Sequence, residues 1–355
     1  MASLKEVKNR ISSVKSTRQI TSAMKMVASA KLHKAQGRIE NMLPYQRKLN
    51  EILTNFLSTD ATIESPYTDE RPVGRVAIVA FSSNSSLCGA FNSNVAKMLE
   101  RTLEEYQSLG REDIQIYPVG KKVEEAVKKL GFVPQGSYQE MADKPSYMQA
   151  YELAGTLMKE FLEGRVDKVE LIYHHFKSTG SQILTRDEYL PINLDKVAEE
   201  ATESTAGKSS FNNDYIVEPS AARLITELLP KVLSQKIYTV LLDSNTSEHA
   251  ARMLAMQAAT DNANELIQDL TKQYNKSRQQ AITNELLDII GGSMKLFSRR
   301  ETVIRGYIPK GYSLLLLYPA VLLLKNSRPI CLFPCLFILP LPLIRINRKN
   351  NGAKL

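Results

Sequence analysis

Three side chains near the middle of the sequence have the chemistry for nucleophilic catalysis. Cys88 follows an apolar run and could act as a thiolate nucleophile, with His174 or His175 as its base. The segment around Cys88 carries no local catalytic signature, and a single cysteine at a strand-to-helix turn is more often a packing residue. A stand-alone Rossmann-like enzyme that uses Cys88 therefore remains an alternative interpretation.

The same region contains no recognisable phosphate-binding loop. The segment SSNSSLCGAFNSN after the apolar run has one glycine and matches neither GxGxxG nor GxxxxGK[ST]. The Gly-Lys pair in PVGKK (Pro118–Lys122) lacks the upstream glycine and the following Ser or Thr. Backbone donors that cradle a phosphate need those glycines, so the sequence argues against a bound nucleotide.

The remaining ionisable clusters also favour structural roles. His174 and His175 would lie on a strand and point to opposite faces, and a metal site would need further ligands that the sequence does not place. Asp261, Glu265 and Asp269 share a helix face with the spacing of a solvated stripe. We expect no catalytic residue, no cofactor and no metal site in this chain.

The elements that would hold these side chains alternate between strand and helix over residues 74–192. An α/β domain with a partly parallel sheet is expected from this order. Strands are predicted at 75–81, 114–119, 168–176 and 182–190, and helices at 91–109, 121–130 and 147–162. Residues 193–213 are polar and rich in Ser, Thr and Asn, which predicts a loop.

The first 57 residues read as one long helix. Neither Gly nor Pro occurs before Gly37, and Leu4, Val7, Ile11 and Val14 recur on one face. Ser3 and Glu6 have the spacing of a capping box. Such a helix would be ~80 Å long at ~1.5 Å per residue, which exceeds the diameter of an ordinary domain.

Residues 219–292 predict a second long helix. Pro219 stands at its start, Pro230 interrupts it, and the pair Gly291-Gly292 is expected to end it. An approximate apolar stripe includes Leu254 and Leu266, and the stripe positions between them are mostly alanines. Because neither helix could bury its stripe alone, we expect a long antiparallel coiled coil of the N- and C-terminal helices beside a Rossmann-like α/β domain.

The charge of the chain is concentrated at its two ends. The 355 residues carry a formal net charge of +8. Residues 1–50 hold 11 lysines and arginines against 2 glutamates, and residues 293–355 hold 11 against 1, so the middle is acidic. The basic first helix lacks interleaved aromatic residues and carries an apolar stripe, which favours a partner helix over nucleic acid.

Residues 293–355 form an atypical apolar, proline-rich tail. SLLLLYPAVLLL (Ser313–Leu324) and PICLFPCLFILPLPLI (Pro329–Ile344) are each shorter than the ~20 residues of a membrane helix. Repeated prolines would also break a helix. A frame-shifted or read-through sequence without an evolved role is the preferred interpretation of the tail. The alternatives are a peripheral membrane contact, a poorly ordered appendage, and a membrane-anchored interaction protein held by Ser313–Ile344.

Several motifs in these helices resemble one family. LKEVKNRISSVKSTRQITSAMKMVASAKLHKAQ (Leu4–Gln36), SEHAARMLAMQAATDNANELI (Ser247–Ile267) and YNKSRQQAITNELLDIIGG (Tyr274–Gly292) resemble the terminal helices of the gamma subunit of F-type ATP synthases, of the bacterial type. SSLCGAFNSN (Ser85–Asn94) resembles the LCGGFN turn of that family, with Ala90 for the second Gly. The resemblance covers residues 1–292.

The resemblance implies a non-catalytic central rotor shaft. The shaft couples proton-driven rotation of a membrane ring to conformational cycling of catalytic sites in an alpha/beta hexamer. The implied partners are the alpha and beta subunits, the epsilon subunit and the membrane ring, with no nucleic acid and no small-molecule substrate. The N-terminus has no secretory signal and enters the first helix directly, so we expect a peripheral protein on the cytoplasmic face of the bacterial inner membrane.

The resemblance also assigns contact residues. The rotor–stator contacts it implies lie on both long helices, and the membrane-ring contacts lie before the second. The expected rotor–stator residues are Met24, Lys25, Arg252, Arg278, Gln279, Thr283 and Glu285, and the expected membrane-ring residues are Tyr215 and Glu218.

Overall fold

The computed structural model describes residues 3–59, 65–192 and 221–306. The chain divides into two compact units, Met1–Ala281 and Ile282–Leu355. All the strands and all the helices except the end of the last one belong to the first unit. The predicted loop at 193–213 and the apolar runs at Ser313–Ile344 lie outside the described residues.

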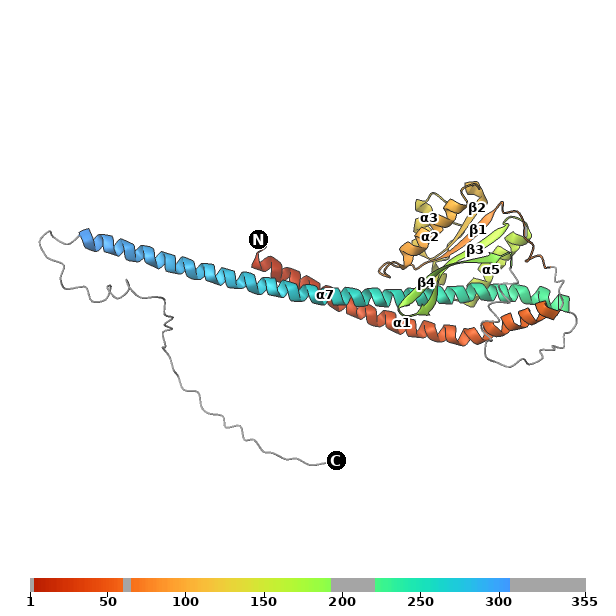
Figure 1. Cartoon of the computed structure of the whole chain (residues 1–355), viewed down its shortest axis with the longest axis horizontal. Helices are drawn as coiled ribbons and strands as arrows, with labels where there is room; N and C mark the ends of the chain where they lie inside the picture. The colour runs from red at the N-terminus through yellow and green to blue at the C-terminus, as the bar shows by residue number, and fades with distance from the viewer. Residues whose placement is uncertain (1–2, 60–64, 193–220, 307–355) are drawn as a thin grey trace, which may run out of the picture. The chain divides into compact units, whose positions relative to one another are not determined.

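Two long helices enclose the α/β elements in sequence (Figure 1). The N-terminal helix is α1 (Leu4–Thr59) and the C-terminal helix is α7 (Ala221–Gly306). Between them the helices are α2 (Phe91–Glu105), the 3-10 helix η1 (Arg111–Asp113), α3 (Lys121–Lys129), α4 (Gln139–Asp143) and α5 (Tyr147–Leu162). The strands are β1 (Val76–Phe81), β2 (Ile114–Val119), β3 (Lys168–Ser178) and β4 (Ser181–Leu190).

The sheet is mixed, as the strand–helix alternation predicts. Its order is β2-β1-β3-β4. β1 runs parallel to both β2 and β3, with Val76 opposite Ile114 on one side and Lys168 on the other. β4 returns antiparallel to β3 in a hairpin. The partly parallel α/β domain is therefore confirmed.

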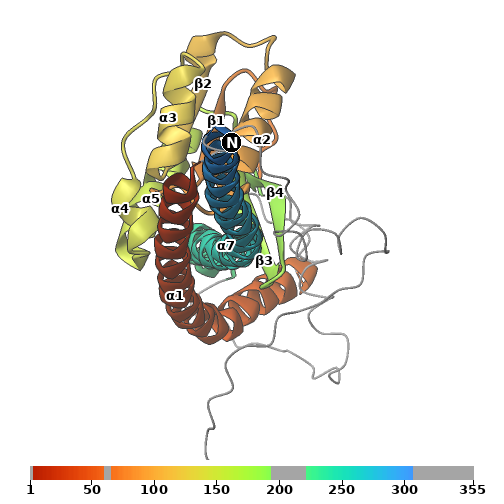
Figure 2. The same ribbon diagram turned by 90° about the vertical axis from the view of Figure 1, so that its left-hand side faces the viewer.

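Helices cover both faces of the sheet, and alternate residues of β1 divide between them. Ile78 packs in a cluster with α2 and α3, whereas Val79 packs in a cluster with α5 and α7. This follows from the two-residue period of a strand, which sends successive side chains to opposite faces. Figure 2, which looks along the long helices, shows α2 and α3 above α7.

The first part of α7 belongs to the core of the α/β domain. Leu233, Ile237 and Leu241 are buried in the same cluster as Val79 and Leu171 of the sheet. The C-terminal coiled-coil helix expected over residues 219–292 therefore also supplies a core helix to the α/β domain in this segment. Its apolar side chains face both the sheet and α1, so here α7 is wedged between two layers.

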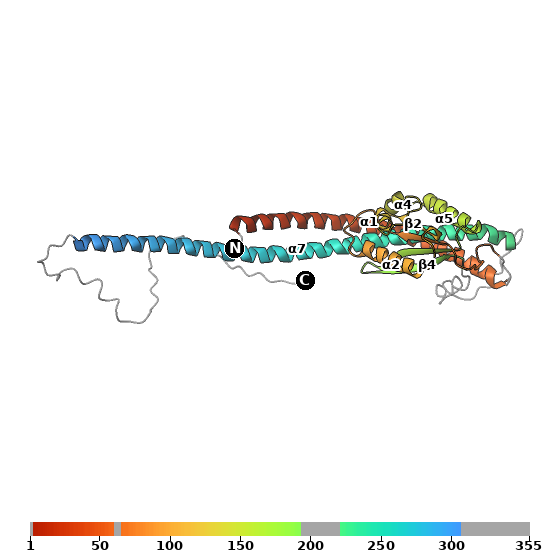
Figure 3. The same ribbon diagram turned by 90° about the horizontal axis from the view of Figure 1, so that it is seen from above.

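α1 pairs antiparallel with α7, and the two lie side by side in Figures 1 and 3. Arg18 Nη1 donates to Asn264 Oδ1 at 3.3 Å, and the hydroxyls of Thr21 and Thr260 lie 2.9 Å apart. Further along α1, Leu53 shares a buried cluster with Leu229. As the residue number rises along α1, the number of its contact residue on α7 falls by about the same amount, which is the pattern of an antiparallel pair.

The seam has the spacing of a coiled coil. On α1 the less exposed positions alternate in steps of three and four residues from Leu4 to Leu53, the period of a left-handed coiled coil. On α7 they follow the same rule from Met256 to Ala281. The α1 seam positions are Leu4, Val7, Ile11, Val14, Arg18, Thr21, Lys25, Ala28, Leu32, Ala35, Ile39, Met42, Gln46, Leu49 and Leu53.

Two sequence expectations about α7 need correction. Leu254 and Leu266 were placed in the stripe but are 38% and 40% exposed, whereas Met256 and Ala263 are buried in the seam. Gly291 and Gly292 were expected to end the helix, but it continues to Gly306. A glycine inside a helix costs only about 1 kcal/mol, and ending a helix at glycine requires a left-handed backbone.

Glycines that do adopt that left-handed conformation follow the shorter helices. Gly131 after α3 has a φ of 80° and Gly164 after α5 has a φ of 67°. The hydrogen bonds there have the expected pattern, with the Gly131 N–H donating to Lys128 O and the Gly164 N–H to Phe161 O. Glycine thus ends these two helices through its conformation and not merely by its presence.

Candidate functional site

Cys88 lies in the loop between β1 and α2, and its thiol is buried among polar side chains of the same loop and of α2. Cys88 is 1% exposed, and its sulfur lies 3.1 Å from Asn92 Nδ2 and 3.7 Å from Ser83 Oγ. Ser83 Oγ in turn donates to Ser85 O at 2.6 Å. The near neighbours of the thiol are an amide and a hydroxyl, not an imidazole, so this geometry does not support Cys88 as an activated nucleophile.

The two histidines on β3 have separate surroundings. His174 is buried and stacks on Phe91 with 4.3 Å between ring centroids, and burial lowers its pKa to about 4. His175 Nδ1 lies 2.5 Å from Asp243 Oδ2 on α7. Their side chains lie on opposite sides of the strand as predicted: His174 packs on an aromatic ring, and His175 pairs with a carboxylate.

The position where this fold would hold a phosphate is filled by the chain itself. The first backbone N–H groups of α3 all donate to the β1–α2 loop, from Lys121 to Asn84 Oδ1 at 2.9 Å, from Lys122 to Ser83 O at 3.1 Å and from Val123 to Ser82 Oγ at 3.0 Å. These are the donors that would cradle an anion at a helix N-terminus. A phosphate at this helix N-terminus would have to displace the loop oxygens that already accept these hydrogen bonds.

Gly120 is required for this close approach. Its φ is +105°, and a Cβ at this position would lie 2.3 Å from Ser82 O. The Gly-Lys pair of PVGKK therefore serves the contact between β1 and α3.

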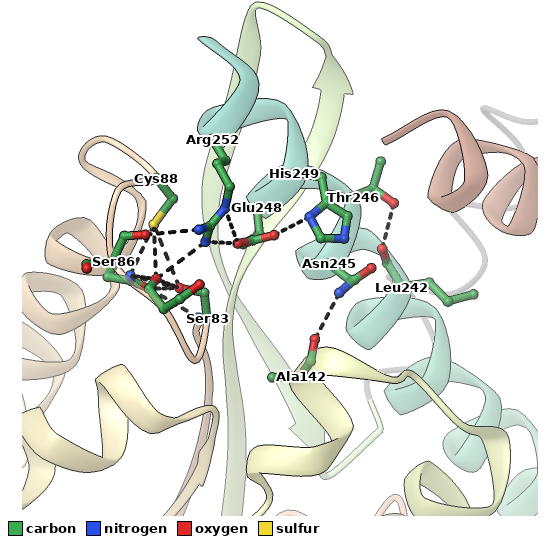
Figure 4. Close-up of polar contacts among 12 residues, drawn as sticks. Ser83, Ser86, Cys88, Ala142, Leu242, Asn245, Thr246, Glu248, His249 and Arg252 are labelled. Atoms are coloured by element: carbon green, nitrogen blue, oxygen red, sulfur yellow. Dashed lines mark hydrogen bonds and ion pairs between the residues drawn. The ribbon is translucent and has the colours of Figure 1, made fainter. Parts of the chain in front are cut away.

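Arg252 fastens the β1–α2 loop to α7. Its guanidinium donates to Ser86 O at 3.0 Å and to Ser85 O at 3.4 Å, and its Nε donates to Glu248 Oε1 at 3.0 Å. Figure 4 shows the guanidinium between the Glu248 carboxylate and the loop. The Arg252 side chain is 14% exposed, so the chain itself uses most of its hydrogen-bonding capacity.

Glu248 keeps its negative charge in this cluster. Burial by itself would raise the pKa of Glu248, but the hydrogen bond from His249 and the charges of His249 and Arg252 hold that pKa below its ordinary value. Asn245 on the same helix face donates to Ala142 O at 2.9 Å. α7 thus grips two separate segments of the α/β domain within two helical turns (Figure 4).

A cavity of about 300 Å³ lies beside this cluster, where α1, α7 and the β1–α2 loop meet. Met24 and Arg252, two of the expected contact residues, both line it. The full lining is Ala23, Met24, Val27, Ala28, Lys31, Ser83, Asn84, Ser85, Ala142, Asp143, Glu248, His249 and Arg252. A second cavity of about 240 Å³ is lined by Cys88, Gly89, Ala90, Phe91, Asn94, His174, Gln182, Ala251, Leu254 and Ala255.

The other expected contact residues are spread over the chain. Lys25 takes a seam position on α1. Arg278 and Gln279 are exposed on α7 in the first unit, and Thr283 and Glu285 are exposed in the second unit. Tyr215 and Glu218 lie outside the described residues.

The sequence alone did not identify the residues that position Arg252. Glu248 stands four residues before Arg252, a spacing that favours ion pairs on a helix and could have indicated the pair. The carbonyls of Ser85 and Ser86 carry no such signal.

The structure describes residues 3–59, 65–192 and 221–306. Within these ranges, no group of three or more His, Cys, Asp and Glu side chains is placed to hold a metal ion. Asp261, Glu265 and Asp269 are exposed, as their spacing predicts. No helix in the described part of the chain is long and apolar enough to cross a membrane.

Comparison with known proteins gives one consistent result. The family model described as ATP synthase matches residues 3–296. The ATP synthase gamma chain of Bacteroides fragilis is 72% identical over 294 residues, which cover 83% of this chain and 100% of that protein. The gamma chain of Flavobacterium johnsoniae is 43% identical over 297 residues, covering 83% of this chain and 99% of that protein.

A solved structure matches the fold. A chain of the Euglena gracilis mitochondrial ATP synthase, solved as OSCP/F1/c-ring in rotational state 3, aligns with a TM-score of 0.60 and 21% identity. The alignment covers 88% of this chain and 99% of that one. At this identity the likeness concerns the fold.

Proposed function

Because the chain belongs to the ATP synthase family and specifically to its gamma chains, we propose that it is the central rotor shaft of an F-type ATP synthase. It is a non-catalytic subunit. Proton flow turns a membrane ring, the shaft turns with the ring, and its asymmetric surface drives the catalytic sites of an alpha/beta hexamer through their conformations in turn.

The observation that carries this proposal is that one helix, α7, belongs both to the α/β domain core and to the coiled coil. Its first part packs in the core of the α/β domain through Ile237, and its later part pairs with α1 through Thr260. A torque applied to the domain therefore passes into the coiled coil through a continuous helix. Long helices without a break supply the stiffness that such transmission needs.

Exposed apolar side chains near the end of α7 are consistent with a surface that turns inside the catalytic hexamer. In the second unit, exposed apolar side chains of α7 recur at intervals that place most of them on one helix face. An exposed apolar stripe of this kind needs a partner to cover it. These residues are Ile282, Leu286, Leu287, Ile289 and Ile290.

The contact residues take their roles from this function. Arg278, Gln279, Thr283 and Glu285 form the upper contact with the catalytic subunits, and Met24, Lys25 and Arg252 belong to the lower one. Tyr215 and Glu218, just before α7 in the sequence, contact the membrane ring. The epsilon subunit binds the α/β domain, and the assembly lies on the cytoplasmic face of the bacterial inner membrane.

The test uses the chain assembled with alpha and beta subunits. Arg278→Ala should lower ATP turnover of the complex, because the exposed guanidinium is lost from the upper contact, while Lys276→Ala on the same stretch of α7 serves as the matched control. The purified chain alone should not hydrolyse ATP. ATP hydrolysis by the isolated chain, or failure of the wild-type chain to join alpha and beta subunits, would overturn the proposal.

The tail needs its own experiment. Deleting residues 296–355 should leave assembly with alpha and beta subunits intact, because the family model ends its match at residue 296. A protein anchored by Ser313–Ile344 would instead be released from membranes by the deletion while losing its partner interactions. Co-purification and membrane sedimentation of the full and shortened chains separate these two results.

A further inference from the structure

We propose that the second cavity, formed by the start of α2, the β3–β4 hairpin and α7, binds a planar, uncharged aromatic molecule that hydrogen-bonds to the imidazole of His174. Such a ligand has one or two fused aromatic rings and one N–H or O–H group. The site is independent of the proposed function, since it needs neither the alpha and beta subunits nor the membrane ring.

The second cavity has room for a molecule of this size. Its volume is about 240 Å³. An apolar protein cavity of about 150 Å³ accommodates benzene, so the larger volume leaves space for a second ring. Gly89 and Ala90 belong to the lining and are exposed to solvent, so the cavity opens at the surface and a ligand can enter.

Part of the cavity lining is a pair of stacked rings. The imidazole of His174 and the ring of Phe91 lie 4.3 Å apart between centroids, with 23° between their planes, and both residues line the cavity. α7 contributes the aliphatic side chains of Ala251, Leu254 and Ala255 to the same lining. Aromatic rings favour offset-stacked and edge-on contacts with other rings, so this lining suits a flat apolar molecule.

The imidazole of His174 carries an unsatisfied polar atom. His174 is 3% exposed, and within the described part of the chain its Nδ1 is buried without a hydrogen-bond partner. A neutral imidazole offers one donor and one acceptor, and a buried polar atom left unpaired loses the hydrogen bond that water would have given it. A ligand with one N–H or O–H group would restore a hydrogen bond to the ring.

The lining disfavours charged ligands. Among the described residues that form it, none is Lys, Arg, Asp or Glu. Burial lowers the pKa of His174 to about 4, so the imidazole is neutral near pH 7. A charged group that leaves water without a counter-charge carries a large desolvation cost. The cavity therefore suits an uncharged molecule better than a phosphate, a nucleotide or a carboxylate.

The first cavity has the opposite character. Its lining includes Lys31, Asp143, Glu248 and Arg252, so its walls are charged. An uncharged aromatic probe should therefore prefer the second cavity, and substitutions in each of the two cavities show which one it occupies.

Indole is a suitable probe because it is planar and uncharged and has one N–H donor. The chain contains no tryptophan, so indole emission excited beyond the tyrosine absorption band reports the probe alone. On titration with the full chain we expect a blue shift that saturates as the ring leaves water. Absence of saturable binding below about 1 mM would overturn the proposal.

The hydrogen bond is tested from both sides. N-methylindole lacks the N–H donor, and His174→Phe removes the ring nitrogens while it can keep the stack on Phe91. Each change should weaken binding about fivefold, the typical effect of one hydrogen bond, and the two together should weaken it no further. Equal affinity of the wild-type chain for indole and N-methylindole would overturn the assignment to His174, and this comparison needs no variant.

The location is tested by filling each cavity. Ala255→Leu places a larger side chain in the second cavity and should weaken indole binding about tenfold or more. Ala258→Leu, at an exposed position of α7, is the matched control and should leave binding unchanged, as should Ala23→Leu in the first cavity. Unfolding midpoints without indole show that each variant folds. Loss of binding in Ala23→Leu but not in Ala255→Leu would place the probe in the first cavity and overturn the proposal.

Discussion

The imidazole Nδ1 of His175 on β3 lies 2.5 Å from Oδ2 of Asp243 on α7, while Oδ1 of the same carboxylate accepts the Phe176 N–H at 2.8 Å. One aspartate therefore joins the β3–β4 hairpin to the long helix by both a side chain and a backbone group. One turn further along α7, Ser247 Oγ donates to His174 O at 3.1 Å. The hairpin is fastened to α7 at adjacent residues.

The first prediction concerns the charge of His175. The hydrogen bond to Asp243 raises the pKa of His175 above its ordinary value, against the opposing effect of burial. A raised folded-state pKa gives stability that is fully present below the unfolded value of about 6.5 and is lost as pH rises through the raised value. His175→Gln should therefore cost more stability at pH 5.5 than at pH 8.5.

Urea unfolding of both proteins at the two pH values measures this difference. The His175 side chain is half exposed, so the effect is expected to be small. A cost that grows toward alkaline pH would contradict the assignment.

The second prediction concerns the neighbouring His174, whose pKa is lowered by folding, whereas that of His175 is raised. Burial lowers its pKa to about 4, so the folded chain keeps the imidazole neutral while the unfolded chain binds a proton below about 6.5. Folding should lose roughly 3 kcal/mol through this group as pH falls from 6.5 to 4. His174→Phe, which can keep the stack on Phe91, should remove most of that acid sensitivity in the same urea titration.

The third prediction tests the coiled-coil seam. Ala28 is 2% exposed between α1 and α7, so a larger side chain would force the helices apart. Ala28→Leu should cost about 1–3 kcal/mol, whereas Ala30→Leu on the exposed face of the same turn should be nearly neutral. Thermal unfolding of the two variants checks this, and equal midpoints would argue against close pairing of the helices.

The fourth prediction tests the contact between β1 and α3. Gly120→Ala places a Cβ 2.3 Å from Ser82 O and forces alanine into a φ of +105°, which costs roughly 1–3 kcal/mol from the backbone alone. Gly155→Ala in α5 meets no atom within 4 Å and should stabilise the helix by about 0.5–1 kcal/mol. Opposite shifts of the unfolding midpoint are expected, and a loss in both would contradict the prediction.

Local pattern determined much of the architecture. The bounds of β2 and α5 follow directly from their apolar periodicity, and the long helix at the N-terminus follows from the absence of breakers before Gly37. These features depend on contacts within a few residues, where periodicity and propensity act. The same holds for the motif at Ser85–Asn94, whose residue order carries the family resemblance.

Tertiary structure decided what each element packs against. The sequence placed Leu254 in the seam, but a helix with apolar residues on several faces does not specify which face meets its partner, and packing selects Met256. Arg252, which the resemblance assigns to a rotor–stator contact, turns inward to Ser85 and Ser86 because the fold brings their carbonyls next to α7. The bond from Arg252 to Ser86 O spans more than 160 residues of sequence. Residue type and spacing therefore identify this chain, while long-range contacts determine which of its side chains are held inside it.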